Sequence, residues 1–104
     1  MYKADVEIYA DSSNYAVMRH PGRNFPGALI QGDSLSILCR SADSVRRELE
    51  NGEIEEAQEE LDYLREMLWG LLLHYEQILK EHKLPLPYTE SHPQPPFVLS
   101  DEED

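Results

Sequence analysis

Residues 53–82 read EIEEAQEELDYLREMLWGLLLHYEQILKEH, and this stretch decides the fold. Its apolar residues recur at alternating spacings of three and four, which places them on one face of a helix over four heptads. The series consists of Ile54, Ala57, Leu61, Leu64, Leu68, Leu71, Tyr75 and Ile78, and it closes at His82. Acidic residues fill the first turn, where the helix dipole favours negative charge. The pattern predicts one long amphipathic helix with an apolar seam along one face.

A second helix is predicted just before this stretch, over residues 33–51. Asp33 or Ser34 supplies a side-chain oxygen of the kind that caps a helix start. The apolar positions again follow spacings of three and four, at Leu35, Leu38, Ala42, Val45 and Leu49. Gly52 ends the helix, because glycine readily takes the left-handed conformation. The two helices therefore form an antiparallel hairpin.

Residues 1–32 predict a small antiparallel β-meander of about three strands. The candidate strands cover residues 6–9, 15–19 and 28–31, and turn-forming residues separate them. The predicted fold class is α+β, with a single domain over residues 1–88. Residues 89–104 are rich in proline and acids, and they predict a disordered tail.

The charge of the chain is unevenly distributed. The 104 residues contain 9 Lys+Arg and 21 Asp+Glu, which gives a net charge of −12. Residues 48–66 hold nine acids and one base, and the last four residues are all acidic, so the remainder balances at eight against eight. Negative charge disfavours direct binding to nucleic acid or to an anionic membrane. The longest apolar run, residues 71–73, is far too short for a membrane span.

The acidic segment around the helix turn is the leading candidate for a binding site. Like charges at helical spacing, such as Glu55 and Glu59, destabilise a helix by a few tenths of a kcal/mol per pair. A surface with only a structural role more often mixes lysines among its acids, although a simply solvated helix face remains the alternative. We predict a non-enzymatic site for a basic protein partner, for example the toxin of a bacterial immunity pair. Its predicted residues are Glu53, Glu55, Glu56, Glu59, Glu60 and Asp62.

The loop Arg19-His20-Pro21-Gly22-Arg23 is the second candidate. Three cationic groups on a proline-containing turn suit a carboxylate or phosphate, so Arg19, His20 and Arg23 predict an anion sensor as the alternative function. In the structural interpretation, the two arginines pair with acids of the protein's own helices while Phe25 fills the core. A structural homodimer through the second helix is a further alternative.

No residue pattern predicts catalysis, a metal or a cofactor. Cys39 is the only cysteine, has no evident base partner, and is expected to be a small buried residue. The spacing of the four histidines matches no helical chelate. The single cysteine and an N-terminus without a signal-peptide pattern lead us to expect a cytoplasmic protein.

Several motifs together carry a resemblance to a known family. They are Pro-Gly-Arg-Asn-Phe-Pro-Gly at residues 21–27, Gln31-Gly32-Asp33-Ser34-Leu35, His74-Tyr75, and Leu84-Pro85-Leu86-Pro87-Tyr88. Over roughly residues 5–88 the chain resembles a family of short, largely uncharacterised bacterial proteins. The resemblance implies a bacterial cytosolic protein and no particular activity, and it leaves residues 89–104 unexplained.

Overall fold

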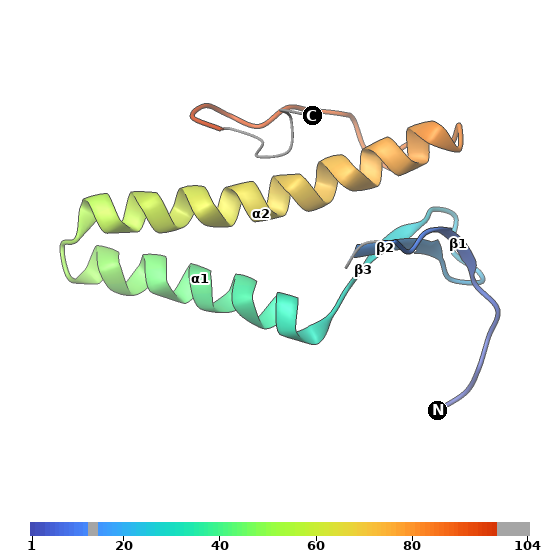
Figure 1. The fold of residues 1–104 in the computed structure, drawn as a ribbon, viewed down its shortest axis with the longest axis horizontal. Helices are drawn as coiled ribbons and strands as arrows, with labels where there is room; N and C mark the ends of the chain where they lie inside the picture. Colours follow the sequence, from blue (N-terminus) through green and yellow to red (C-terminus); the bar gives the residue numbers. More distant parts are fainter. Residues whose placement is uncertain (13–14, 98–104) are drawn as a thin grey trace. The chain divides into compact units, whose positions relative to one another are not determined.

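A computed structural model describes residues 1–12 and 15–97 of the chain (Figure 1). Three strands precede two helices, as the predicted α+β class requires. Every predicted element is present, with each bound within one residue of its predicted position. The elements are β1 (Glu7–Ala10), β2 (Tyr15–Arg19), β3 (Gly27–Ile30), α1 (Gly32–Glu50) and α2 (Ile54–Glu81). Residues 89–97 form neither helix nor strand, and the rest of the predicted tail lies outside the described residues.

The chain divides into two compact units, and α2 runs from one into the other. The first unit combines Met1–Gln31 with Leu71–Ser91, so it contains the three strands and the C-terminal half of α2. The second combines Gly32–Gly70 with the chain from His92 onward, so it contains α1 and the N-terminal half of α2.

The sheet of the first unit is an antiparallel meander in the order β1-β2-β3. On one side of β2, Val17 pairs with Ala10, and on the other it pairs with Ala28. The register of β1 shifts between Ile8 and Ala10, so Tyr9 is an extra residue in that strand. This places Val17 at the centre of the sheet with small residues on both sides.

The core of the first unit forms where the sheet meets the C-terminal half of α2. Val17, Tyr75 and Leu79 make up its buried cluster, and Val17 and Leu79 have no exposed surface. Further apolar residues pack against this cluster from β1, from α2 and from the segment after α2: Tyr9, Ala10, Leu72, Ile78, Leu84 and Leu86. Leu79 lies beside the predicted seam, so the observed core is turned toward that flank of the helix.

The segment after α2 folds back onto the helix. The hydroxyl of Tyr88 donates to Oε2 of Glu76 at 2.8 Å, and Glu76 is buried. Burial raises the pKa of the Tyr88 hydroxyl, and the hydrogen bond to Glu76 raises it further. The neutral hydroxyl therefore serves as a donor that satisfies a buried carboxylate.

Both helices end in the same backbone motif. At the end of α1 the amide of Glu53 donates to the carbonyl of Glu48 at 2.8 Å, and Gly52 takes the left-handed conformation with φ of 77°. At the end of α2 the amide of Leu84 donates to the carbonyl of Leu79 at 2.9 Å, and Lys83 has φ of 57°. This motif satisfies carbonyls that a helix end leaves unpaired and turns the chain sharply. It explains the short connection between α1 and α2.

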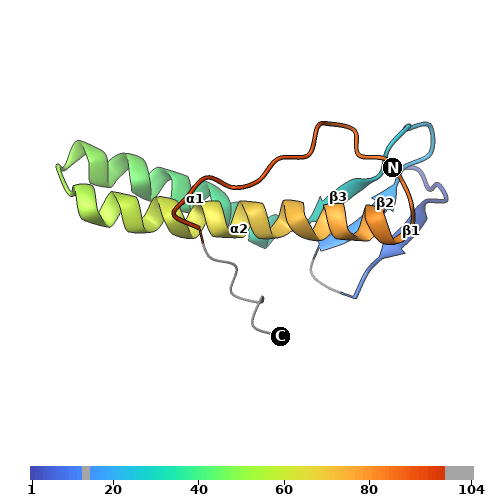
Figure 2. The same cartoon turned by 90° about the horizontal axis from the view of Figure 1, so that it is seen from above.

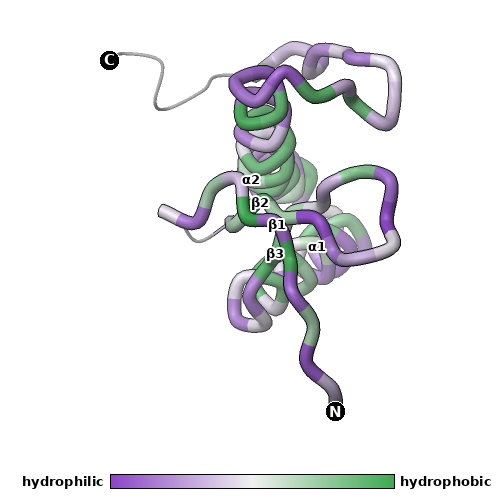
Figure 3. Tube along the Cα trace, turned by 90° about the vertical axis from the view of Figure 1, so that its right-hand side faces the viewer, coloured by the Kyte–Doolittle hydropathy of each residue, from purple (hydrophilic) through white to green (hydrophobic). Residues whose placement is uncertain are grey.

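In the second unit, α1 and the N-terminal half of α2 run side by side in opposite directions (Figures 1 and 2). Hydrophobic residues recur turn by turn along α2 (Figure 3). Ala57 lies on the buried face, but Ile54, Leu61 and Leu68 are 50%, 43% and 45% exposed. These three seam residues therefore stay partly exposed, because a single neighbouring helix covers only part of a wide apolar stripe.

We expect Leu79→Ala to lower the free energy of unfolding by about 2–5 kcal/mol, because it leaves a cavity in a core with few other buried side chains. Urea unfolding followed by circular dichroism measures the change. Leu29→Ala is the control, since Leu29 is 52% exposed and its truncation leaves no cavity. Equal destabilisation by the two changes would contradict this description of the core.

Candidate functional site

The acidic segment surrounds the turn between α1 and α2. Glu53 lies in the turn, and the other five predicted residues lie on α2. Helical spacing divides those five into two groups. Glu55, Glu59 and Asp62 follow one another at four and three residues along the outward face, whereas Glu56 and Glu60 lie on a flank. The predicted site is therefore an outward row and a separate flank.

The outward row continues to Glu66, four residues beyond Asp62, and Glu66 is not among the residues predicted from the charge count. Its spacing would have identified it. Glu66 and Asp62 line a depression of about 190 Å³ together with Pro96 and Phe97. We call the row Glu55, Glu59, Asp62 and Glu66, together with Glu53, Glu56 and Glu60, the acidic corner.

Little positive charge from the protein itself neutralises the acidic corner. Arg65 pairs with Asp62 at 3.0 Å, and at the end of α1 Arg46 pairs with the neighbouring Glu50 at 3.0 Å. Within residues 1–12 and 15–97, no ion pair or hydrogen bond engages the side chains of Glu53, Glu55, Glu56, Glu59 and Glu60.

Arg65 is further occupied by the chain that follows the helices. Its guanidinium donates to the carbonyl of Pro96 at 3.0 Å and to the carbonyl of Gln94. These bonds hold residues 94–96 beside the N-terminal half of α2 (Figures 1 and 2). Arg65 is the one base between residues 48 and 66. Because it bonds both to Asp62 and to backbone carbonyls, it neutralises little of the surrounding negative charge.

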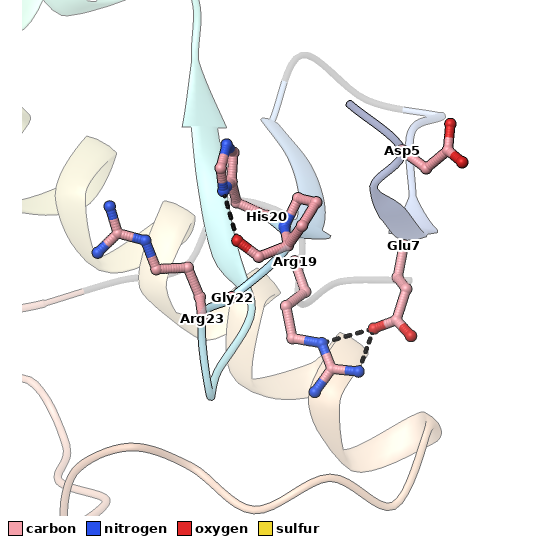
Figure 4. A pocket seen from close by; sticks show the side chains of 7 residues that line it. Asp5, Glu7, Arg19, His20, Gly22 and Arg23 are labelled. Carbon is pink, nitrogen blue, oxygen red and sulfur yellow. Dashed lines mark hydrogen bonds and ion pairs between the residues drawn. The ribbon is translucent and has the colours of Figure 1, made fainter. Parts of the chain in front are cut away.

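The arginine loop lies between β2 and β3 in the first unit. Residues Asp5, Glu7, Arg19, His20, Pro21, Gly22 and Arg23 line an open depression of about 380 Å³ (Figure 4). Nδ1 of His20 is 2.9 Å from the carbonyl of Pro21, and the amide of Arg23 donates to the carbonyl of His20 at 3.1 Å. These contacts give the loop a compact turn.

Arg19 points to Glu7 rather than to an open site (Figure 4). Its Nε donates to Oε1 of Glu7 at 2.5 Å, and its Nη2 forms an ion pair with the same oxygen. Arg19 thus pairs with an acid of β1, not with a helix as the structural interpretation proposed. The side chain of Arg23 forms no interaction within the described residues and points away from this pair. Two carboxyl groups in the lining also reduce its attraction for an anion.

The loop is fastened at its far end by a buried hydrogen bond. The hydroxyl of Tyr75 on α2 donates to the carbonyl of Pro26 at 2.6 Å, and Pro26 is buried. Burial raises the pKa of the Tyr75 hydroxyl, which keeps it a donor. Phe25 is 40% exposed, so the expectation that it fills the core is wrong. Pro26 takes the buried position because its carbonyl meets Tyr75.

The remaining candidates for chemistry are isolated side chains. Within the described residues no three His, Cys, Asp or Glu side chains gather where they could hold a metal ion. Cys39 is exposed on α1, which corrects the expectation of a buried residue. Among the helices of the described chain, none is long and apolar enough to cross a membrane.

The fold and its two charged features define a small α+β protein with a β-meander, a helix hairpin and an acidic corner. Residues 1–88 match the family of unknown function DUF6959, and the chain belongs to this family. No curated protein and no solved structure matches the chain. The family match ends at Tyr88, so residues 89–104 lie beyond it.

We expect Tyr75→Phe to lower the free energy of unfolding by about 1–3 kcal/mol, because the buried carbonyl of Pro26 loses its donor. The loss is measured by urea unfolding. Tyr63→Phe is the matched control, since Tyr63 is exposed and its hydroxyl has no partner within the described residues. A Tyr75→Phe variant as stable as the control would show that this bond does not fasten the loop.

The pKa of Glu7 is lowered from its ordinary value of 4.5, because the Tyr9 hydroxyl and the Arg19 guanidinium both donate to its carboxylate. A lowered pKa means that these bonds stabilise the fold above about pH 4.5 and that this contribution disappears as the pH falls through the lowered pKa. NMR titration of the Glu7 carboxyl should give a midpoint below 4.5, and Tyr9→Phe or Arg19→Gln should each raise it. A wild-type midpoint at or above 4.5 would contradict the observed pairing.

Proposed function

We propose that this protein is a non-enzymatic binding module whose acidic corner docks on a basic protein. The observation that carries the proposal is the set of five carboxylates without an internal partner, Glu53, Glu55, Glu56, Glu59 and Glu60. Four of the five are exposed, and Glu60 is half-buried. A concentration of like charge at one place has a cost in folding stability that a basic partner would offset.

Glu48 adds to this cost. Its Oε1 is buried at the end of α1 and has no hydrogen-bond partner within the described residues. A buried carboxylate oxygen without a donor is unfavourable. Arg46 and Arg47 precede Glu48 in the chain but pair with Glu50 and Ser44 instead. The charge pattern is therefore better explained by recognition than by folding.

The corner suits a protein that itself binds nucleic acid. Glu55, Glu59, Asp62 and Glu66 follow one face of α2 over eleven residue steps, which at about 1.5 Å per step corresponds to roughly 17 Å. A row of negative charges of this length can occupy a groove that a phosphate backbone would otherwise fill. In its concrete form, the protein is a bacterial cytoplasmic immunity-type inhibitor that blocks a cationic toxin such as a nuclease. The long-range field of the corner accelerates encounter with such a partner.

The anion-sensor alternative has weaker support from the geometry. Arg19 is engaged by Glu7, and Arg23 is the one arginine of the loop whose side chain makes no interaction within the described residues. A single exposed guanidinium among two carboxyl groups offers little selectivity for an anion.

The test compares two variants that lose the same charge at different places. The corner variant carries Glu→Gln at Glu55, Glu56, Glu59 and Glu60, which preserves side-chain size and helix propensity. The control variant carries Asp→Asn at Asp5, Asp11 and Asp43 and Glu→Gln at Glu90, all exposed acids outside the corner.

We expect immobilised wild-type and control proteins to capture the same basic protein from an extract of the native host. The corner variant should capture it at least about 10-fold less at low salt, with a weaker salt dependence. Quantitative mass spectrometry of the captured proteins measures this. Equal capture by all three, or capture of no basic protein, would contradict the proposal.

A further inference from the structure

We propose that the hairpin of α1 and α2 binds a second copy of this chain through an apolar face, forming a four-helix arrangement. Six residues make up this face, Leu35, Ala42 and Leu49 on α1 and Ile54, Leu61 and Leu68 on α2. All six are exposed. The proposal concerns a different face of the helices from the acidic corner and does not require the corner to bind a partner.

The first argument is the spacing of the exposed apolar residues on each helix. On each helix the three residues are seven apart, which is the repeat of a helix that packs against another helix along its length. A run of polar positions would be expected on a solvated face. Two such stripes on adjacent helices are the surface that half of a four-helix bundle presents to its other half.

The second argument is that the two stripes lie on the same side of the hairpin. On α1, Leu35 and Ala42 lie three residues before and four after the half-buried Leu38. On α2, Leu61 and Leu68 have the same relation to the half-buried Leu64. Both stripes are thus rotated in the same sense from the inward-facing residues. Because α1 and α2 run antiparallel, equal rotations about their own axes turn both stripes to one face.

The third argument is the thin packing of the second unit. Its buried residues within the described chain are Ser41 and Ala57, both small. Large aliphatic side chains remain half-exposed in both helices, although helices in proteins owe most of their stability to packing of an apolar face. A second hairpin of the same kind would supply the missing packing.

The size of the face approaches what a dimer needs. The 19 residues of α1 span about 28 Å at 1.5 Å per residue, and two helices about 10 Å wide give a footprint of roughly 550 Å² before corrugation is counted. Specific interfaces take about 800 Å² of accessible surface from each partner. The face therefore supplies most of the area that a stable dimer needs, and its self-complementarity fits two-fold symmetry.

The acidic corner determines the orientation of the two copies. Residues 48–66 carry a charge of −8 in each copy, so two adjacent corners would repel strongly. Opposite orientation separates the two turns by about the hairpin length of 28 Å, well beyond the screening length of about 8 Å at physiological salt. The outward row lies on the face of α2 away from the stripe, so each corner stays accessible.

Analytical ultracentrifugation of the full chain tests the proposal. The chain is measured from about 1 to 100 µM, a range that covers typical dissociation constants of protein dimers, at about 50 and 500 mM NaCl. We expect the mass of two 12.0 kDa chains at both salt concentrations, because apolar burial does not weaken with salt. A monomer throughout would overturn the proposal and leave the face to another segment of the chain or to a different protein. A dimer lost at high salt would also overturn it, since charge would then hold the copies together.

Matched variants locate the interface. Leu49→Gln with Leu61→Gln should weaken dimerisation at least about 10-fold, since both residues lie on the proposed face. Ile37→Gln with Tyr63→Gln is the control: these residues are 47% and 51% exposed, against 51% and 43% for Leu49 and Leu61, but lie on the other flank of the helices. Dissociation by the control pair alone would overturn the proposal.

A distance measurement on an otherwise folded dimer keeps the test decisive if the Leu→Gln variant loses its helices. Asn51→Cys in a Cys39→Ser background places one spin label at the hairpin turn, because the chain has a single native cysteine. Pulsed electron paramagnetic resonance should show a separation of about 28 Å or more between the labels of the two copies. A separation below about 20 Å, or the absence of any intermolecular distance, would overturn the antiparallel dimer.

Discussion

The contact between Val17 on β2 and the Tyr75–Leu79 turn of α2 is the interaction on which the first unit depends. A three-stranded meander this small needs a helix on one face to be stable. The same turn of α2 also provides the Tyr75 hydroxyl that fastens the carbonyl of Pro26. Packing of the sheet and placement of the arginine loop therefore share one short stretch of helix. This explains why a small number of fully buried residues is enough to order the strands.

The N-terminal half of α2 differs, because its surface departs from a sequence optimised for stability. Its first four turns combine an outward row of acids with an apolar stripe that α1 covers only in part. Both features lower the stability of the hairpin alone, the acids through repulsion and the stripe through exposed apolar surface. Local departures from an optimal sequence of this kind are expected where a surface serves recognition. Two kinds of recognition on two faces of one helix would account for both departures.

The predicted elements agree with the structure to within one residue because each carries a strong local signal. Heptad spacing delimits the helices, and Gly52 at a left-handed φ closes the first of them. The candidate sites were less predictable. The charge count located the acidic corner, but spacing alone did not show that Arg65 is engaged by backbone carbonyls of the following chain. The pairing of Arg19 with Glu7 depends on the register of β1 against β2, which composition does not reveal.

By itself, the amino-acid sequence determined the order and bounds of the elements and the place of the excess charge, because periodicity, turn residues and charge are local properties of the chain. Only the tertiary structure decided which apolar residues are covered. Leu79 is buried while Leu61 and Leu68 are 43% and 45% exposed, although all three belong to one wide apolar stripe. The reason is that the apolar stripe of a helix is wide, and only the part in contact with a neighbouring sheet or helix becomes buried.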